Sequence, residues 1–231
     1  MYTPIPNNVE AGFKYRGNFS SEEAYLRIGF IRKVYSILFL QIVTTAVVSA
    51  VMMISPDKTA DFISRNIEVL YVCLFGSIVV LVFTLLFRKI YPINLMLLSV
   101  FTLMQSFLIG MACAFSETKA VLSAALATAC VFCGLTVYVW TTTRDYTMLI
   151  GIAYSLLFSF IFVSLFGLIW RLPFEAILYS LVGVCIFSLY IVIDTHMITD
   201  VLPYDEYVYG AIQLYLDLLN LFLHLLKLFQ K

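Results

Sequence analysis

Residues 68–87 read EVLYVCLFGSIVVLVFTLLF, and Arg88 and Lys89 follow directly. Glu68 is the only charged residue in this stretch, and it stands at the first position. A helix needs roughly 20 mostly apolar residues to cross a bilayer, which is about the length of this run. Basic residues tend to flank such runs at the membrane surface. The stretch therefore predicts a transmembrane helix that ends before Arg88.

The composition extends this prediction to the whole chain. Of its 231 residues, 62% are hydrophobic and 12% are charged, against about 45–50% and about 25% in a soluble domain. The mean hydropathy is +0.99. The net charge is zero and no block of like charge occurs, so nothing indicates nucleic-acid binding. All five cysteines lie in apolar runs, which argues against a disulfide framework.

The apolar pattern recurs along the chain and predicts an all-α membrane protein, a bundle of seven transmembrane helices. The last segment is the least uniformly apolar, so an alternative in which it re-enters without crossing stays open. The predicted spans cover residues 34–54, 68–87, 93–114, 120–140, 148–169, 174–194 and 208–229.

The polar residues 1–33 precede the first span. We expect a cytosolic N-terminal tail with a short interfacial helix, followed by the bundle over residues 34–231. With the N-terminus in the cytosol, that side holds eight of the 14 Lys and Arg residues and the opposite side holds six. This bias, together with the basic cluster before the first span, favours a cytosolic N-terminus.

Four polar residues recur along the last apolar segment: Gln213, Asp217, Asn220 and His224. Their spacing of i, i+4, i+7 and i+11 places them on one helical face. An aspartate near the bilayer centre costs on the order of 3 kcal/mol, so this polar stripe should face the bundle interior. Two interpretations stay open, namely a structural seam of interhelical hydrogen bonds and a pathway for ions or protons.

Three charged residues are expected in the cytosolic half of the bundle. Asp194 ends the sixth span, Arg88 ends the second, and Asp217 lies roughly 13 Å into the seventh from the same side. Adjacent carboxyls share a proton, and a nearby arginine competes for pairing. We predict a triad that switches between an Asp–Asp contact and an Asp–Arg pair near neutral pH. The alternative is ordinary span-ending charges, and we expect Asp200 and Asp205 of the next loop to be solvated.

Five segments resemble the transmembrane Bax-inhibitor-motif family, in its lifeguard and Golgi anti-apoptotic branch. They follow one another in the family's order and spacing from about residue 24 to the end. The segments are IRKVYSILFLQ at 31–41, YPINL at 91–95, IDTH at 193–196, DEYV at 205–208 and LYLDLLNLF at 214–222.

The resemblance implies a seven-helix bundle in Golgi or endoplasmic-reticulum membranes that lowers stored calcium through a pH-sensitive leak and inhibits apoptosis. By motif, the family's paired aspartates correspond to Asp194 and Asp217, its basic residue after the second span to Arg88, and its loop glutamate to Glu206. Calcium would be the permeant ion, with no cofactor and no bound metal. Partners that fit are the lipid bilayer, apoptosis regulators, calcium-release channels and further copies of the chain.

Two other interpretations compete with a channel. The first is a non-conducting membrane protein that suppresses cell death by binding partners. The second is an intramembrane enzyme, which the motifs disfavour. A three-histidine zinc hydrolase needs more than the two histidines present, and Leu214–Asp217 lacks the Gly-x-Gly-Asp of aspartyl proteases. We therefore expect no enzymatic activity.

Overall fold

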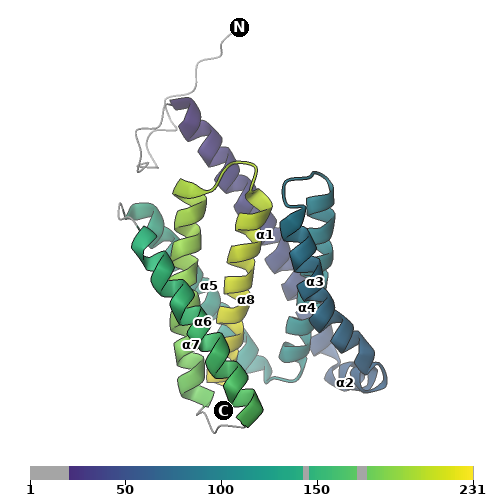
Figure 1. Ribbon diagram of the computed structural model, residues 1–231. Coiled ribbons are helices and arrows are strands. Elements are labelled where there is room, and N and C mark those ends of the chain that lie inside the picture. The colour runs from purple at the N-terminus through teal and green to yellow at the C-terminus, as the bar shows by residue number, and fades with distance from the viewer. Residues whose placement is uncertain (1–20, 143–145, 171–175, 231) are drawn as a thin grey trace.

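The computed structural model describes residues 21–142, 146–170 and 176–230 (Figure 1). The described residues form helices and no strand, which confirms the all-α prediction. Most of the predicted tail, residues 1–20, lies outside the described ranges. The helices are α1 Ser21–Ile54, α2 Pro56–Arg65, α3 Ile67–Leu86, α4 Ile93–Ala114, α5 Thr118–Thr141, α6 Thr147–Trp170, α7 Ala176–His196 and α8 Tyr207–Phe229, with a π-helical turn η2 at Met197–Val201.

Six of the described helices are long and apolar enough to cross a membrane, namely α1, α3, α4, α5, α7 with η2, and α8. Helix α6 is not among these six, because its apolar stretch within the described residues, Leu149–Ser164, is shorter. The membrane-protein class and six of the spans are therefore confirmed in the described part of the chain, whereas the count of seven stays a prediction.

Two elements near the N-terminus differ from a simple succession of spans. Helix α1 runs without a break from Ser21 to Ile54, so the segment expected to be interfacial continues directly into the first span. Helix α2 was not predicted. Pro56 stands in its first turn, where the missing N–H has no helical partner to lose. With 10 residues α2 is too short to cross a bilayer.

Helix α8 is the centre of the bundle (Figure 1) and packs against α7, α5, α1 and α4. Leu214, Tyr215 and Leu221 are completely buried there. Large apolar side chains cover the outside instead, and Leu86 and Phe39 are each about 70% exposed. An apolar exterior around a packed interior is what lipid as the solvent favours, because lipid does not penalise exposed apolar surface.

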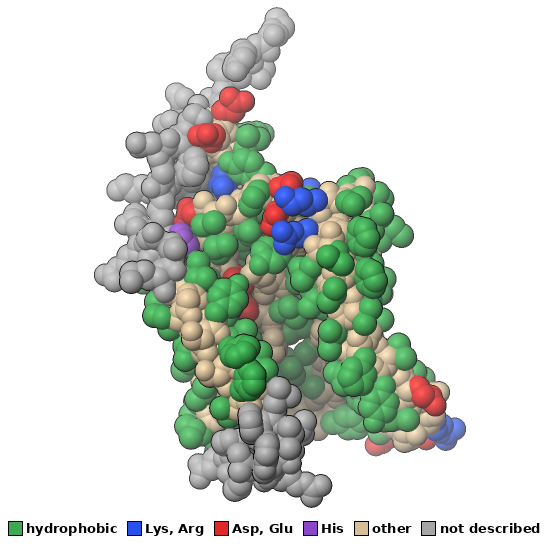
Figure 2. All heavy atoms as spheres, viewed as in Figure 1, with side chains coloured by type: hydrophobic (Ala, Val, Ile, Leu, Met, Phe, Trp, Pro, Cys, Tyr) green, Lys and Arg blue, Asp and Glu red, His purple; other side chains and the backbone are tan. Residues whose placement is uncertain are grey.

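Helix α3 stands apart from this centre and packs mainly on α4. Figure 2 shows the surface hollowed between α3 and α8. Tyr209, Gln213, Leu216 and Asn220 recur along α8 and are only partly buried. The central helix therefore keeps a partly open, largely polar side between packed neighbours.

Candidate functional site

Asp194 and Asp217 come together inside the bundle. Asp194 lies near the end of α7 and Asp217 in the middle of α8, and these adjacent helices are joined by η2 and a short loop. The two residues are 4% and 6% exposed, and their carboxyls lie close enough to interact with each other. Two neighbouring carboxylates repel each other in an apolar interior, so this arrangement favours one proton shared by the pair.

Few other groups support this carboxyl pair. Gln213 donates from Nε2 to Oδ1 of Asp194 at 3.4 Å. Oδ2 of Asp217 is buried and has no partner among the described residues. A buried polar oxygen without a hydrogen bond is costly, about 1–3 kcal/mol. The arrangement is therefore poorly optimised as a structural seam, and it leaves an oxygen free to accept a proton or a cation.

The polar stripe on α8 divides between different environments. Gln213 and Asp217 contact Asp194 as described, but Asn220 donates from Nδ2 to the carbonyl of Leu216 in its own helix at 2.8 Å. His224 is buried against three aromatic rings, with centroid distances of 5.6 Å to Phe160, 5.5 Å to Tyr179 and 5.7 Å to Phe187. Only the first half of the stripe belongs to the carboxyl pair.

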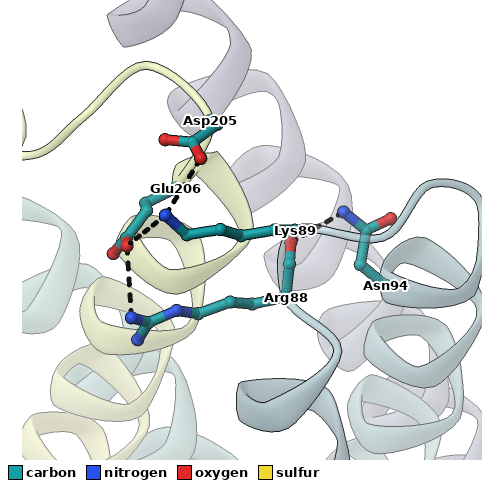
Figure 3. Close-up of polar contacts among 5 residues, drawn as sticks. All are labelled: Arg88, Lys89, Asn94, Asp205 and Glu206. Atoms are coloured by element: carbon teal, nitrogen blue, oxygen red, sulfur yellow. Dashed lines mark hydrogen bonds and ion pairs between the residues drawn. The ribbon is translucent and has the colours of Figure 1, made fainter.

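Arg88 binds Glu206 (Figure 3) rather than joining the predicted triad. Its guanidinium donates to Oε1 of Glu206 at 3.1 Å, and it lies over the Tyr209 ring at 4.9 Å from the centroid. Helix α3 ends at Leu86, so Arg88 lies beyond it, at the level of the loop before α8. Asp217 lies ~15 Å deeper, at helical rise from Tyr207. The structure thus joins the two aspartates and places Arg88 elsewhere.

Four charged residues form what we call the α3–α8 clamp: Arg88, Lys89, Asp205 and Glu206 (Figure 3). Nζ of Lys89 lies 3.0 Å from Oδ2 of Asp205 and 3.2 Å from Oε1 of Glu206. The hydrogen bond from Lys89 lowers the pKa of Asp205, and the bonds to Asp205 and Glu206 raise the pKa of Lys89. The clamp joins the end of α3 to the start of α8 across the hollow in Figure 2.

Hydrogen bonds from Asn94 and Arg27 hold the clamp and the segment beside it in place. Asn94, completely buried at the start of α4, donates from Nδ2 to the carbonyl of Arg88 at 2.9 Å and to the Tyr207 hydroxyl at 3.1 Å. On the other side, Arg27 of α1 donates to the carbonyl of Leu202 at 2.6 Å. The segment before α8 is therefore held by α1, α3 and α4 together.

Sequence reasoning missed several of these contacts. Asp205 and Asp200 were expected to be solvated. Asp205 is exposed but also forms an ion pair, and Asp200 is partly buried. Asp205 pairs with Lys89, and Oδ2 of Asp200 lies 2.9 Å from Nδ1 of His196. The spacing of His196 and Asp200 could have predicted their contact, since residues at i and i+4 are neighbours on a helix. Asn94 stands in the YPINL motif, but nothing in that motif reveals which groups its amide meets.

Comparisons with known proteins show to which family the chain belongs. A sequence model of the family described as "Inhibitor of apoptosis-promoting Bax1" matches residues 27–231. The chain belongs to the Bax-inhibitor family. This confirms the resemblance inferred from the motifs. The described residues of this chain contain no group of three or more His, Cys, Asp or Glu residues placed to hold a metal ion.

Three relatives show how far the similarity within the Bax-inhibitor family extends. The chain is 33% identical over 224 residues to the Golgi anti-apoptotic protein of vaccinia virus (strain Lister), covering 97% of this chain and 94% of that protein. It is 33% identical over 221 residues to protein lifeguard 4 of Mus musculus, covering 96% and 92%. It is 38% identical over 213 residues to protein LIFEGUARD 1 of Arabidopsis thaliana, covering 89% and 90%. None of these three names describes an enzyme.

Proposed function

We propose that this protein is a passive, pH-sensitive calcium leak of Golgi or endoplasmic-reticulum membranes, and that it inhibits apoptosis by lowering stored calcium. The carboxyl pair of Asp194 and Asp217 carries the proposal. Carboxylate oxygens are the ligands that a hard cation such as Ca²⁺ prefers. A proton and a calcium ion compete for the same oxygens, so occupancy by calcium would depend on pH.

Three features support a permeation role over a purely structural one. The two carboxyls are buried in an apolar bundle, where ionisable groups are costly and usually functional. The free Oδ2 of Asp217 leaves the pair open to a further ligand. The partly buried polar side chains of Gln213 and Asn220 lie on the same helix, one turn before and after Asp217, and offer amide oxygens along the hollow side of α8.

The topology that fits this proposal has seven spans and a cytosolic N-terminus, with α6 as the additional crossing. The α3–α8 clamp then lies at the cytosolic end of the bundle, because α3 and α7 both run towards that side. In this arrangement the clamp closes the cytosolic mouth of the hollow between α3 and α8, and the carboxyl pair lies below it. Opening requires α3 and α8 to separate.

Calcium flux through purified full-length protein in liposomes tests the proposal. The wild type should release trapped or admit external calcium, and Asp217→Asn should change the dependence of that flux on pH. Asp61→Asn is the matched control, because Asp61 is an exposed carboxylate on α2 that pairs with Arg65. An unchanged pH profile in Asp217→Asn removes the sensing role. A wild type without flux above empty liposomes supports the alternative, a non-conducting protein that suppresses death through partners.

A further inference from the structure

A groove runs between α6 and α7, and neither residue of the carboxyl pair lines it. It has a volume of about 280 Å³ and is lined by Leu156, Phe160 and Val163 of α6 and by Leu178, Val182 and Ile186 of α7. Leu156, Val163, Leu178 and Val182 are between 43% and 62% exposed, so the groove is open along its length. In a membrane span, such an opening faces the lipid.

The groove presents no free hydrogen-bonding group to its occupant. Ser159 also lines it, but its hydroxyl donates to the carbonyl of Ser155 at 2.8 Å. The hydroxyl of Tyr179, at one end, is hydrogen-bonded to that of Ser164 at 2.9 Å. From Leu178 to Ile186 the groove spans ~12 Å at helical rise, close to the depth of one leaflet, which is half of the ~30 Å hydrocarbon core. An acyl chain fits these properties.

A cation marks one end of the groove. Nζ of Lys227, in the last turn of α8, lies 5.6 Å from the centre of the Tyr179 ring, and this ring lines the groove. Lys227 is exposed and has no ion-pair partner in the part of the chain that the structure describes. Tyrosine and lysine at the end of a span are typical of the headgroup region.

Packed rings form the inner wall of the groove. Phe160 and Tyr179 stack on each other with centroids 4.6 Å apart, and His224 packs behind both rings. Nδ1 of His224 is buried without a partner among the described residues. Because three helices fix these rings, the end of the groove beside Lys227 is formed without a ligand, which lowers the cost of ordering on binding.

We propose that this groove is a binding site for an anionic phospholipid, with one acyl chain between α6 and α7 and the phosphate-bearing headgroup on Lys227. The combination of an apolar channel of leaflet depth and an unpaired cation at its polar end specifies the ligand class. A zwitterionic lipid of the same chains fits the groove equally well but gains less from the lysine. The site is separate from the carboxyl pair, so it does not depend on calcium permeation.

Native mass spectrometry of the full chain in detergent, with phosphatidylserine or phosphatidylcholine of identical acyl chains, tests the proposal. The wild type should retain phosphatidylserine in preference. Lys227→Gln should weaken this retention roughly fivefold, as expected for losing one lysine near an anionic headgroup, while Lys227→Arg preserves it. Lys119→Gln is the control, because Lys119 is an exposed lysine at the same end of the bundle and lies outside the groove.

A second variant tests the acyl-chain half of the site. Val182→Trp fills the groove from an exposed position that tolerates a large apolar side chain, so it should reduce retention of both lipids while helical content and thermal unfolding stay unchanged. A phospholipid with a photoreactive acyl chain should label α6 and α7. Equal retention of the two lipids by the wild type, equal losses in Lys227→Gln and Lys119→Gln, or labelling spread evenly over all exposed helices would overturn the proposal.

Discussion

Gly183 on α7 lies directly against the imidazole of His224 on α8. A Cβ atom at position 183 would come within 2.5 Å of two ring atoms, Cε1 and Nε2. The imidazole has no room to withdraw, because the rings of Phe160, Tyr179 and Phe187 surround it. The absence of a side chain at 183 is therefore what lets α7 and α8 approach at this level.

Gly183→Ala should lower the free energy of unfolding by about 1–3 kcal/mol, the usual penalty for forcing an extra methyl group into a packed interior. Thermal or denaturant unfolding of the purified protein in detergent measures it. Gly134→Ala is the control, since nothing lies within 4 Å of a Cβ there, and alanine in a helix is favoured over glycine by up to ~1 kcal/mol. In a His224→Ala background the penalty at 183 should disappear, and its persistence would show that the contact is not its cause.

Arg27→Met should destabilise the segment before α8. Arg27 is only 6% exposed. Its guanidinium donates to the carbonyls of Leu202 at 2.6 Å and Ile198 at 3.5 Å, and it lies 4.7 Å from the centre of the Tyr204 ring. Methionine keeps the apolar stem but removes every donor. We expect a loss of about 1.5–3 kcal/mol in unfolding free energy, as for hydrogen bonds to charged groups.

The same measurement on Arg32→Met separates the lost contact from the lost charge. Arg32 lies on the same helix but is exposed, so its replacement should change stability by less than ~0.5 kcal/mol. Limited proteolysis gives a local readout, because cleavage between Leu202 and Glu206 should accelerate only in Arg27→Met. Equal cleavage of both variants would contradict the assigned role of Arg27.

The sequence predicted six spans that the structure supports and the proximity of the two aspartates, because both follow from helical geometry. An apolar run of the right length specifies a span, and α7 and α8 are neighbours along the chain, so Asp194 and Asp217 need only the correct faces to meet. The contact between them depends on two helices alone, which is why spacing was sufficient.

The clamp and the surroundings of His224 could not be predicted in this way. Arg88 and Glu206 are 118 residues apart and lie in two connecting segments, whose conformation no helical period describes. His224 shares a helical face with Asp217, but its neighbours come from α6 and α7, whose aromatic residues look lipid-facing in sequence. Helix α2 was missed because a 10-residue helix with mixed polarity resembles a loop.

The clamp should contribute constant stability over the physiological pH range. Lys89 lowers the pKa of Asp205 below its usual 3.8, so this contribution is present above pH 3.8 and is lost as pH falls through the lowered value. The pKa of Lys89 is raised above 10.5, so its contribution is present below pH 10.5 and is lost as pH rises through the raised value.

Unfolding of the wild type and of Asp205→Asn, measured from pH 3 to pH 9, checks this assignment. The difference between the two proteins should stay constant from about pH 5 to pH 9 and shrink below about pH 4, because an aspartate protonated in both folded and unfolded chains no longer distinguishes the variants. A difference that changes between pH 6 and pH 8 would mean that the Lys89–Asp205 pair itself senses neutral pH. We expect the stabilities of the two proteins to change in parallel between pH 6 and pH 8, which leaves the sensing of neutral pH to the carboxyl pair.

Under the proposed function, reversing one charge of the clamp should increase calcium flux. Lys89→Glu places a third acidic group beside Asp205 and Glu206 and leaves Arg88 as the remaining cation of the clamp, so α3 and α8 repel where they now bind. Because partly exposed ion pairs contribute up to ~1 kcal/mol, we expect a two- to fivefold rise in liposome flux.

Adding Asp205→Lys to Lys89→Glu restores opposite charges and should return flux towards the wild-type level. Lys119→Glu makes the same reversal outside the clamp and should leave flux unchanged. A double variant that leaks as much as Lys89→Glu alone would show that the ionic bridge does not hold the path closed.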